Sequence, residues 1–215
     1  MAEPEPTGTK LALITAAGEL FAEHGLEGTS VRAIAEKAGT NVAAINYHFG
    51  SKENLHAEVM RYVMLDADLR RPSTLLQDEE RFNTPEGIAQ VIAELIHGRF
   101  ETYFSQDQPS WYSRLIVRAF LDRTPSLNVV VQQVFRPDQE AVMHILRRAN
   151  PTLSEEEACF WAFSLNAEIA FFEFCKTPIL LLLEKESYDQ SFLKAAAGHV
   201  ARMITAALGL PEPVE

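Results

Sequence analysis

Cysteine is scarce in this 215-residue sequence, which contains only Cys159 and Cys175. If both lie on one continuous helix, the sixteen positions between them correspond to about 24 Å, too far for a disulfide within the chain. A fold held together by disulfides is therefore excluded. Two free thiols are typical of a reducing compartment, so we expect a cytoplasmic protein.

Long apolar runs without interruption are also missing. The most lipid-like stretch is ACFWAFSLNAEIAFFEFCKTPILLLL, residues 158–183, which is long enough to cross a bilayer. It is interrupted by Asn166, Glu168, Glu173, Lys176 and Pro178. Because charges in the centre of a bilayer are costly, the sequence favours a buried helix followed by a short apolar segment over a membrane span.

Motifs that carry catalysis are not found. The sequence has no glycine-rich phosphate loop, no nucleophile elbow and no metal-ligand spacing, and His24, His48 and His56 are too scattered to indicate a metal site. We therefore expect no enzymatic activity, no cofactor and no bound metal.

The start of the chain, MAEPEPTG, is acidic and lacks an apolar run, which is not typical of a signal peptide. We expect residues 1–8 to form a disordered tail.

Positive charge is in short supply over the whole chain. The 19 Lys and Arg residues stand against 30 Asp and Glu residues, and the net charge of −11 argues against a nucleic-acid partner. The balance differs locally, since residues 29–56 contain three basic and two acidic side chains, whereas residues 61–215 contain 15 basic and 22 acidic ones. The electrostatic objection to DNA therefore does not apply to the N-terminal region.

Apolar spacing close to 3.6 is present nearly throughout, and strand-like alternation is scarce, so the sequence predicts an all-α protein. Helices are expected over 9–24, 30–38, 42–49, 51–71, 85–105, 110–123, 126–149, 154–176 and 188–208, with a polar loop over 72–84. Pro137 should kink or break the helix that contains it. Ser154 and Glu157 have the spacing of a capping box.

The stretch VRAIAEKAGTNVAAINYHFGSKENL, residues 31–55, predicts two short helices joined by a tight turn at Gly39. The second helix has Ile45 and Phe49 on one side, and a helix of eight residues is stable only if such a side packs against neighbours. Its opposite side has small residues at the start, followed by the amide of Asn46 and the phenol of Tyr47.

This outward side suits a helix whose first turn enters a DNA major groove. Small side chains permit close approach, the N-terminal amides favour phosphate, and the Asn46 amide can pair with an adenine edge. Spacing alone leaves a second interpretation open, because two short helices and a glycine turn also occur as plain packing in enzymes.

The segment AAGELFAEHGLEGTSVRAIAEKAGTNVAAINYHFGSKENL, residues 16–55, resembles the DNA-binding domain of the TetR family of transcriptional regulators. The resemblance runs continuously through ELFAEHG, TSVRAIAEKAG, INYHF and GSKENL. It implies an N-terminal three-helix helix-turn-helix domain over residues 9–55 and a C-terminal helical bundle over residues 56–215 for effector binding and dimerisation.

Carried over position by position, the resemblance implies that the third helix reads bases through Val42, Ala43, Ala44 and Asn46. The residues expected at DNA phosphates are Thr29, Ser30, Arg32, Asn41, Tyr47, His48 and Lys52. The sequence departs from the family pattern at Asn46, where tyrosine is frequent, and at Val42, where lysine or another polar residue is usual. These departures imply a different operator sequence.

The middle of the chain is rich in aromatic residues, and the family usually senses a small molecule in this region. The residues expected to line an effector pocket are His97, Phe100, Phe104, Trp111, Arg118, His144, Trp161, Asn166 and Glu168. An ordinary core would also explain the aromatic members, and pairing with neighbours would explain the polar ones. Residues 114–148 are similar to the effector domain of a subgroup linked with exporters, which implies an amphipathic or aromatic effector.

The resemblance further implies a homodimer formed by the helices at about 154–176 and 188–208. The expected function is that of a DNA-binding regulator, a repressor that a small hydrophobic or amphipathic effector releases from its operator, and activation remains possible. Two other interpretations stay open, an enzyme and an all-α interaction protein that has lost DNA binding.

Overall fold

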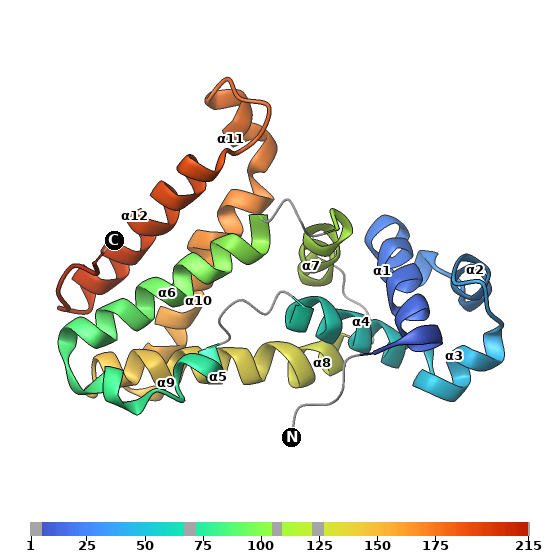
Figure 1. The fold of residues 1–215 in the computed structure, drawn as a ribbon, viewed down its shortest axis with the longest axis horizontal. Helices are drawn as coiled ribbons and strands as arrows, with labels where there is room; N and C mark the ends of the chain where they lie inside the picture. The colour runs from blue at the N-terminus through green and yellow to red at the C-terminus, as the bar shows by residue number, and fades with distance from the viewer. Residues whose placement is uncertain (1–5, 67–71, 105–108, 122–126, 215) are drawn as a thin grey trace. The chain divides into compact units, whose positions relative to one another are not determined.

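The computed structural model describes residues 6–66, 72–104, 109–121 and 127–214. Within these ranges every regular element is a helix, which confirms the expected all-α class (Figure 1). The chain forms two compact units, an N-terminal unit of residues 1–67 and 106–136 and a C-terminal unit of residues 68–105 and 137–215. The boundary expected at residue 55 divides the chain by function rather than by packing, and it stays a prediction.

Three helices open the N-terminal unit: α1 (Gly8–Gly28), α2 (Val31–Lys37) and α3 (Val42–Phe49). Most of the tail expected over residues 1–8 lies outside the described residues, and the first helix includes Gly8. α1 continues past its expected stop at Gly25, but Gly25 has a φ of 72°, so the regular helix is interrupted there.

The capping residues of α2 and α3 act as the sequence predicts. Ser30 Oγ accepts a hydrogen bond from the Ala33 N–H, and Asn41 Oδ1 accepts one from the Ala44 N–H, each at 3.1 Å. Gly39 has a φ of 65°, a conformation that glycine adopts without strain, and the chain turns there between the two helices (Figure 1).

The N-terminal unit is completed by α4 (Lys52–Asp66), α7 (Trp111–Leu121), α8 (Leu127–Val130) and a π turn, η2 (Val131–Phe135). Both α4 and α7 pack on α1, and α8 and η2 pack on α4. Contact between α1 and α7 is close, because a Cβ built on Gly18 would lie 2.2 Å from the Trp111 ring. The break expected near Pro137 takes the form of the π turn, after which α9 (Arg136–Ala149) begins.

The C-terminal unit contains α5 (Pro72–Leu75), a 3-10 helix η1 (Glu79–Asn83), α6 (Pro85–Phe104), α9, α10 (Glu155–Phe174), α11 (Lys176–Leu182) and α12 (Gln190–Ala207). Two short helices therefore occupy the region expected to be a polar loop. They form because Leu75 and Phe82, each 7% exposed, bury apolar side chains in the core. The expected end of the fourth helix, residues 67–71, lies outside the described residues.

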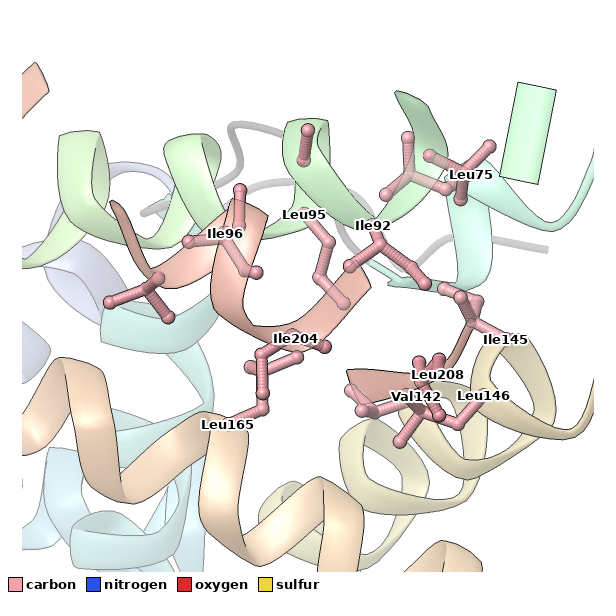
Figure 2. Packing of buried hydrophobic residues seen from close by; sticks show 14 of the residues in the cluster. Leu75, Ile92, Leu95, Ile96, Val142, Ile145, Leu146, Leu165, Ile204 and Leu208 are labelled. Atoms are coloured by element: carbon pink, nitrogen blue, oxygen red, sulfur yellow. The ribbon is translucent and has the colours of Figure 1, made fainter. Parts of the chain in front are cut away.

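Aliphatic side chains from α5, α6, α9, α10 and α12 form the core of the C-terminal unit (Figure 2). α6 and α12 pack against each other, and α10 contacts both. Ile92 and Ile96 of α6 are fully buried, as are Ile145 of α9 and Leu165 of α10. Burial of each such side chain contributes about 1.5–3 kcal/mol, so this layer fixes the positions of α6, α9 and α10.

The apolar stretch near the C-terminus is bent. α10 begins with the expected capping box of Ser154 and Glu157, ends at Phe174 and is followed by α11 at an angle of 68°. In the part of the chain that the structure describes, no single helix is long and apolar enough to span a membrane, and only the bent pair α10–α11 meets the test of length and composition. Cys159 and Cys175 are free thiols.

Candidate nucleic-acid interface and effector site

One side of α3 holds the helix in place. Ile45 is fully buried and Phe49 is 8% exposed, and α3 contacts α1, α2 and α4. α2 is anchored in the same way by Ile34 and Ala35. Since a helix of eight residues is not stable alone, these contacts determine which side of α3 faces solvent.

The opposite side of α3 is exposed. Among the residues expected to read bases, Ala43 and Asn46 are exposed, whereas Val42 and Ala44 are partly buried. Tyr47 is 85% exposed, and its ring touches only its neighbour His48, edge to face, among the ring contacts of the described residues. A large aromatic side chain left in solvent contributes little to the fold, so this position is open to a partner.

The residues that precede α2 and α3 combine two possible roles. Ser30 and Asn41 are exposed, but their side-chain oxygens already accept hydrogen bonds from the helices that they cap. Arg32 in the first turn of α2 is exposed. The expected phosphate contacts of Ser30 and Asn41 would therefore use the remaining donors, the Ser30 hydroxyl hydrogen and the Asn41 NH₂ group.

Two other residues expected at phosphates have structural partners. Thr29 is only 3% exposed, and its hydroxyl donates a hydrogen bond to the Gly25 carbonyl oxygen at 2.7 Å. Lys52 Nζ donates to the Leu26 carbonyl at 2.8 Å and to the Thr29 carbonyl at 3.1 Å. The Lys52 side chain thus ties the start of α4 to the end of α1, whereas the Thr29 hydroxyl bonds carbonyls of α1 itself, and the phosphate contacts of both residues stay predictions.

Basic charge near α3 is limited. Lys37 forms an ion pair with Glu19 at 2.7 Å, and this hydrogen bond and charge raise the pKa of the lysine. Arg32 is exposed, and the first-turn N–H groups of α3 add the positive end of a helix dipole. The interface can therefore bind phosphate through few cations, which agrees with the small positive excess of residues 29–56.

The residues expected to line an effector pocket are divided between the two units. Trp111 and Arg118 belong to the N-terminal unit. Trp111 is 5% exposed and packs against Gly18 of α1, and Arg118 Nη1 donates to the Glu23 carbonyl at 3.1 Å. Their contacts explain both residues as links between α1 and α7.

Phe100 and Phe104 take part in an aromatic cluster of the C-terminal unit. Their ring centroids lie 5.6 Å apart, and Phe172 of α10 lies 5.5 Å from Phe100. Tyr188 and Phe192 complete the cluster, with stacked rings 5.2 Å apart, and the Tyr188 hydroxyl donates to the Phe172 carbonyl. Sequence reasoning included the two residues of α6 and missed the other three.

Asn166, another of the expected residues, belongs to a polar network inside the C-terminal unit. Its Oδ1 accepts a hydrogen bond from Arg99 Nη1 at 2.7 Å, and its Nδ2 donates to Gln139 Oε1 at 3.2 Å. Arg99 Nη2 also donates to Asp138 Oδ2 at 2.6 Å. The network joins α6, α9 and α10.

The other expected residues differ in exposure. His144 and Glu168 are exposed, His97 is half-buried, and Trp161 is partly buried against the aliphatic core. The sequence did contain a signal for Arg99, which stands in register with the buried residues Ile92 and Ile96 of α6. A charged residue at such a position requires a buried partner.

Apolar side chains also remain exposed along α10. They are Phe160, Phe163, Phe171 and Phe174, exposed by 58%, 57%, 56% and 44%. With the exposed Ala167 they recur every three or four residues and so form one stripe, which we call the α10 stripe. In α12 the exposed residues Ala195, His199, Met203 and Ala206 follow the same spacing. Exposed apolar area of this extent marks an interaction surface.

Two family profiles match the chain. The profile described as bacterial regulatory proteins of the tetR family matches residues 13–59, and the profile described as the C-terminal domain of the HTH-type transcriptional dual regulator CecR matches residues 88–208. The first range contains α2 and α3 and the second contains the aromatic cluster, the polar network and the α10 stripe. The expected resemblance is thereby confirmed.

Individual relatives are regulators and not enzymes. The HTH-type transcriptional dual regulator CecR of Shigella flexneri is 29% identical over 187 residues, covering 84% of this chain and 82% of that protein. The HTH-type transcriptional repressor AcnR of Corynebacterium glutamicum is 42% identical over 57 residues, 26% of this chain and 30% of that protein.

Solved structures show the same fold at low sequence identity. NalD of Pseudomonas aeruginosa, the secondary repressor of the MexAB-OprM multidrug efflux pump, aligns with a TM-score of 0.62 and 19% identity over 92% of this chain and 95% of that chain. AibR, in complex with isovaleryl coenzyme A and operator DNA, aligns with a TM-score of 0.62 and 14% identity over 91% of this chain and 97% of that chain. The chain belongs to the TetR family of bacterial transcriptional regulators and has a C-terminal domain of the CecR type.

Proposed function

We propose that this protein is a homodimeric repressor that binds operator DNA through α3 and is released by a small hydrophobic or amphipathic effector. The observation that carries the proposal is the exposed outer side of α3, where Ala43, Asn46 and Tyr47 stand free of the core while Ile45 and Phe49 anchor the helix. It acts on DNA, so its place of action is the cytoplasm.

Base recognition follows from the chemistry of that outer side. The Asn46 amide can accept from and donate to one adenine edge, and Ala43 leaves room for the backbone to approach the groove. The exposed Tyr47 and His48 can reach phosphate oxygens beside the groove. Val42 and Ala44 are partly buried, so their contribution would be apolar contact at the edge of the same surface.

Two copies of α3 are needed for a specific site. A helix-turn-helix unit reads only a few base pairs, and dimers read two half-sites about one helical turn apart. The α10 stripe supports the homodimer, because α10 and α12 contact each other and both leave apolar or small side chains exposed. A second copy of the chain presents the same stripe and can cover it in a symmetric interface.

Effector control requires that a ligand distinguish two states of the dimer. A ligand that binds the DNA-free state a hundredfold more tightly supplies about 2.7 kcal/mol per site. The same factor must appear in both directions, so operator DNA weakens effector binding as much as the effector weakens operator binding. The relatives include both a dual regulator and repressors, and activation from the same reading helix is the second candidate function.

The test is a selection of bound fragments from the source genome, carried out with the purified chain at two salt concentrations. The proposal expects a small set of fragments with paired half-sites, whose affinity falls as salt rises. Sedimentation at the same protein concentrations should show a dimer. No enrichment at either salt concentration would contradict the proposal and favour an interaction protein that has kept the fold without DNA binding.

A further inference from the structure

Arg99 of α6 is an incompletely paired cation inside the C-terminal unit. Its side chain is 15% exposed, and it donates to Asn166 through Nη1 and to Asp138 through Nη2. Its Nε is buried and has no acceptor among the described residues. Buried arginine N–H groups are usually hydrogen-bonded, so an open one is a reason to look for a missing partner.

Arg61 of α4 is an arginine whose guanidinium edge, formed by Nε and Nη2, is fully hydrogen-bonded. Its Nε and Nη2 donate to the two carboxylate oxygens of Glu58, each at 2.8 Å. This is the fork geometry in which a guanidinium binds a carboxylate most strongly. In Arg99 the same edge has one oxygen of Asp138 on Nη2 and nothing on Nε. The edge of Arg99 is therefore one oxygen short of a two-bond carboxylate contact.

Stability does not explain why a cation stands at this position. A buried ion pair often contributes no more than well-packed apolar side chains of similar volume, and the buried positions of α6 around Arg99 are apolar. Asn166 also accepts a hydrogen bond from Arg99, and Gln139 in turn accepts one from Asn166. Polar groups from three helices therefore form one connected network that still contains an open donor, and a small number of placed polar groups is typical of a binding site.

Aromatic side chains follow Arg99 along α6. Tyr103 lies one turn after Arg99, and the charges of Arg99, Asp138 and Glu173 all act on its phenol, whose pKa is raised chiefly by burial. Next to it on α6 are Phe104 and, one turn earlier, Phe100 of the aromatic cluster. A ligand with an anionic head at Arg99 would therefore place its body against aromatic side chains.

We propose that Arg99 anchors the anionic head of the effector, a carboxylate on an apolar body, which takes the place of Asp138 on the guanidinium. The proposal rests on the proposed function and names the chemical class of the effector. Asp138 is the group to be displaced because it uses a single oxygen and lies in the first turn of α9, directly after the π turn η2.

Displacement of Asp138 also offers a route to the DNA-binding helices. η2 ends one residue before α9 begins, and within the N-terminal unit it packs against α4. Release of the Asp138 carboxylate removes the ion pair that holds the start of α9 to α6. A shift of that start is transmitted along the chain to η2 and so bears on α4.

The experiment measures binding of decanoate to the full-length protein by calorimetry, with 1-decanol and decylammonium as probes that have the same body and a different head. Wild type should bind decanoate at least about tenfold more tightly than either of the other two. Arg99→Gln should weaken decanoate binding by about tenfold to hundredfold and leave 1-decanol unaffected.

Asp138→Asn should change decanoate affinity in the opposite direction, toward tighter binding, and a variant that fails to fold could not produce this result. It leaves the Arg99 charge without a carboxylate, so decanoate should bind more tightly by about tenfold and raise the melting temperature more than it does in wild type. The matched control is Arg81→Gln, which removes an ion pair with Glu94 of similar exposure in the same unit and should not alter decanoate binding.

Equal affinity of wild type for decanoate and 1-decanol, no decanoate binding by wild type, or unchanged decanoate binding in Arg99→Gln would each overturn the proposal. Failure of the proposed function has a different signature. If decanoate binds with the expected dependence on Arg99 but does not alter affinity for the selected operator fragment, the anion site stands and the release mechanism falls.

Discussion

Replacement of Lys52 by methionine separates a structural role from a DNA-binding role. Lys52 Nζ donates to the carbonyls of Leu26 and Thr29, which close the C-terminal end of α1, from a position in the first turn of α4. Carbonyls at the end of a helix have no partner within the helix, and the negative end of its dipole favours a cation. Lys52→Met removes the cation and keeps most of the apolar stem.

The size of the effect follows from these two contacts. A hydrogen bond from a charged donor contributes about 1.5–3 kcal/mol when buried, and Lys52 is partly exposed, so we expect a loss of about 1–3 kcal/mol. For a chain of this length that corresponds to a fall in melting temperature of about 2–12 °C. Thermal unfolding is followed by circular dichroism at a fixed protein concentration, because dimerisation makes the midpoint depend on concentration.

The control for this variant is Lys185→Met, which removes an exposed lysine paired with Asp189 and should cost no more than a few tenths of a kcal/mol. An unchanged melting temperature in Lys52→Met would refute the structural role. Operator binding at several salt concentrations tests the second role, since a lost phosphate contact lowers the slope of log affinity against log salt by about one. A slope equal to that of wild type would mean that Lys52 does not contact phosphate.

Three further predictions concern stability and assembly. The Arg61 guanidinium, with Lys10, lowers the pKa of Glu58 from 4.5 to about 2. The stability that the Glu58 carboxylate contributes is therefore present above pH 4.5 and is lost as the pH falls toward 2. In Glu58→Gln the free energy of unfolding should fall by about 1–2 kcal/mol less than in wild type over that pH window. Gly18→Ala should destabilise the chain by about 1–3 kcal/mol in urea unfolding, since its methyl group would overlap the α7 tryptophan ring, whereas Gly198→Ala should be tolerated. Phe163→Glu should shift sedimentation from dimer to monomer with unchanged helical content, and a dimer of wild-type affinity would contradict the assigned interface.

The first three helices could be predicted closely because their signals are local. Ser30 and Asn41 cap α2 and α3 within the sequence that they start, and Gly39 and Gly50 turn the chain with positive φ. Ile45 and Phe49 could be assigned to the core from spacing alone. Which residues lie on the outer side of α3 follows directly from that assignment.

Other parts depended on tertiary contacts that the sequence does not display. The polar region over residues 72–84 folds into α5 and η1 because Leu75 and Phe82 reach the core. The π turn before α9 could be expected only as an unspecified break at Pro137. The helical limits of α10 shifted because Cys175 takes a non-helical conformation at the bend into α11.

The effector site could be predicted least well. The expected pocket residues were selected by type, as aromatic or polar side chains. This grouped Trp111 and Arg118 with residues of the C-terminal unit, although both contact α1 of the N-terminal unit. Arg99 was not among the residues selected, and its partners Asp138 and Asn166 lie 39 and 67 positions away in sequence. Pairing over such distances is not visible in local pattern.

The central claim is that the outer side of α3 reads base edges, and Asn46→Ala tests it most directly. Affinity of wild type and variant is measured for the selected operator, for all single-base changes within it and for unrelated DNA at one fixed salt concentration. The account predicts that the variant loses about 1–3 kcal/mol of discrimination at one symmetric pair of operator positions and keeps its affinity for unrelated DNA. Unchanged discrimination at every position would show that this side of α3 does not face the bases.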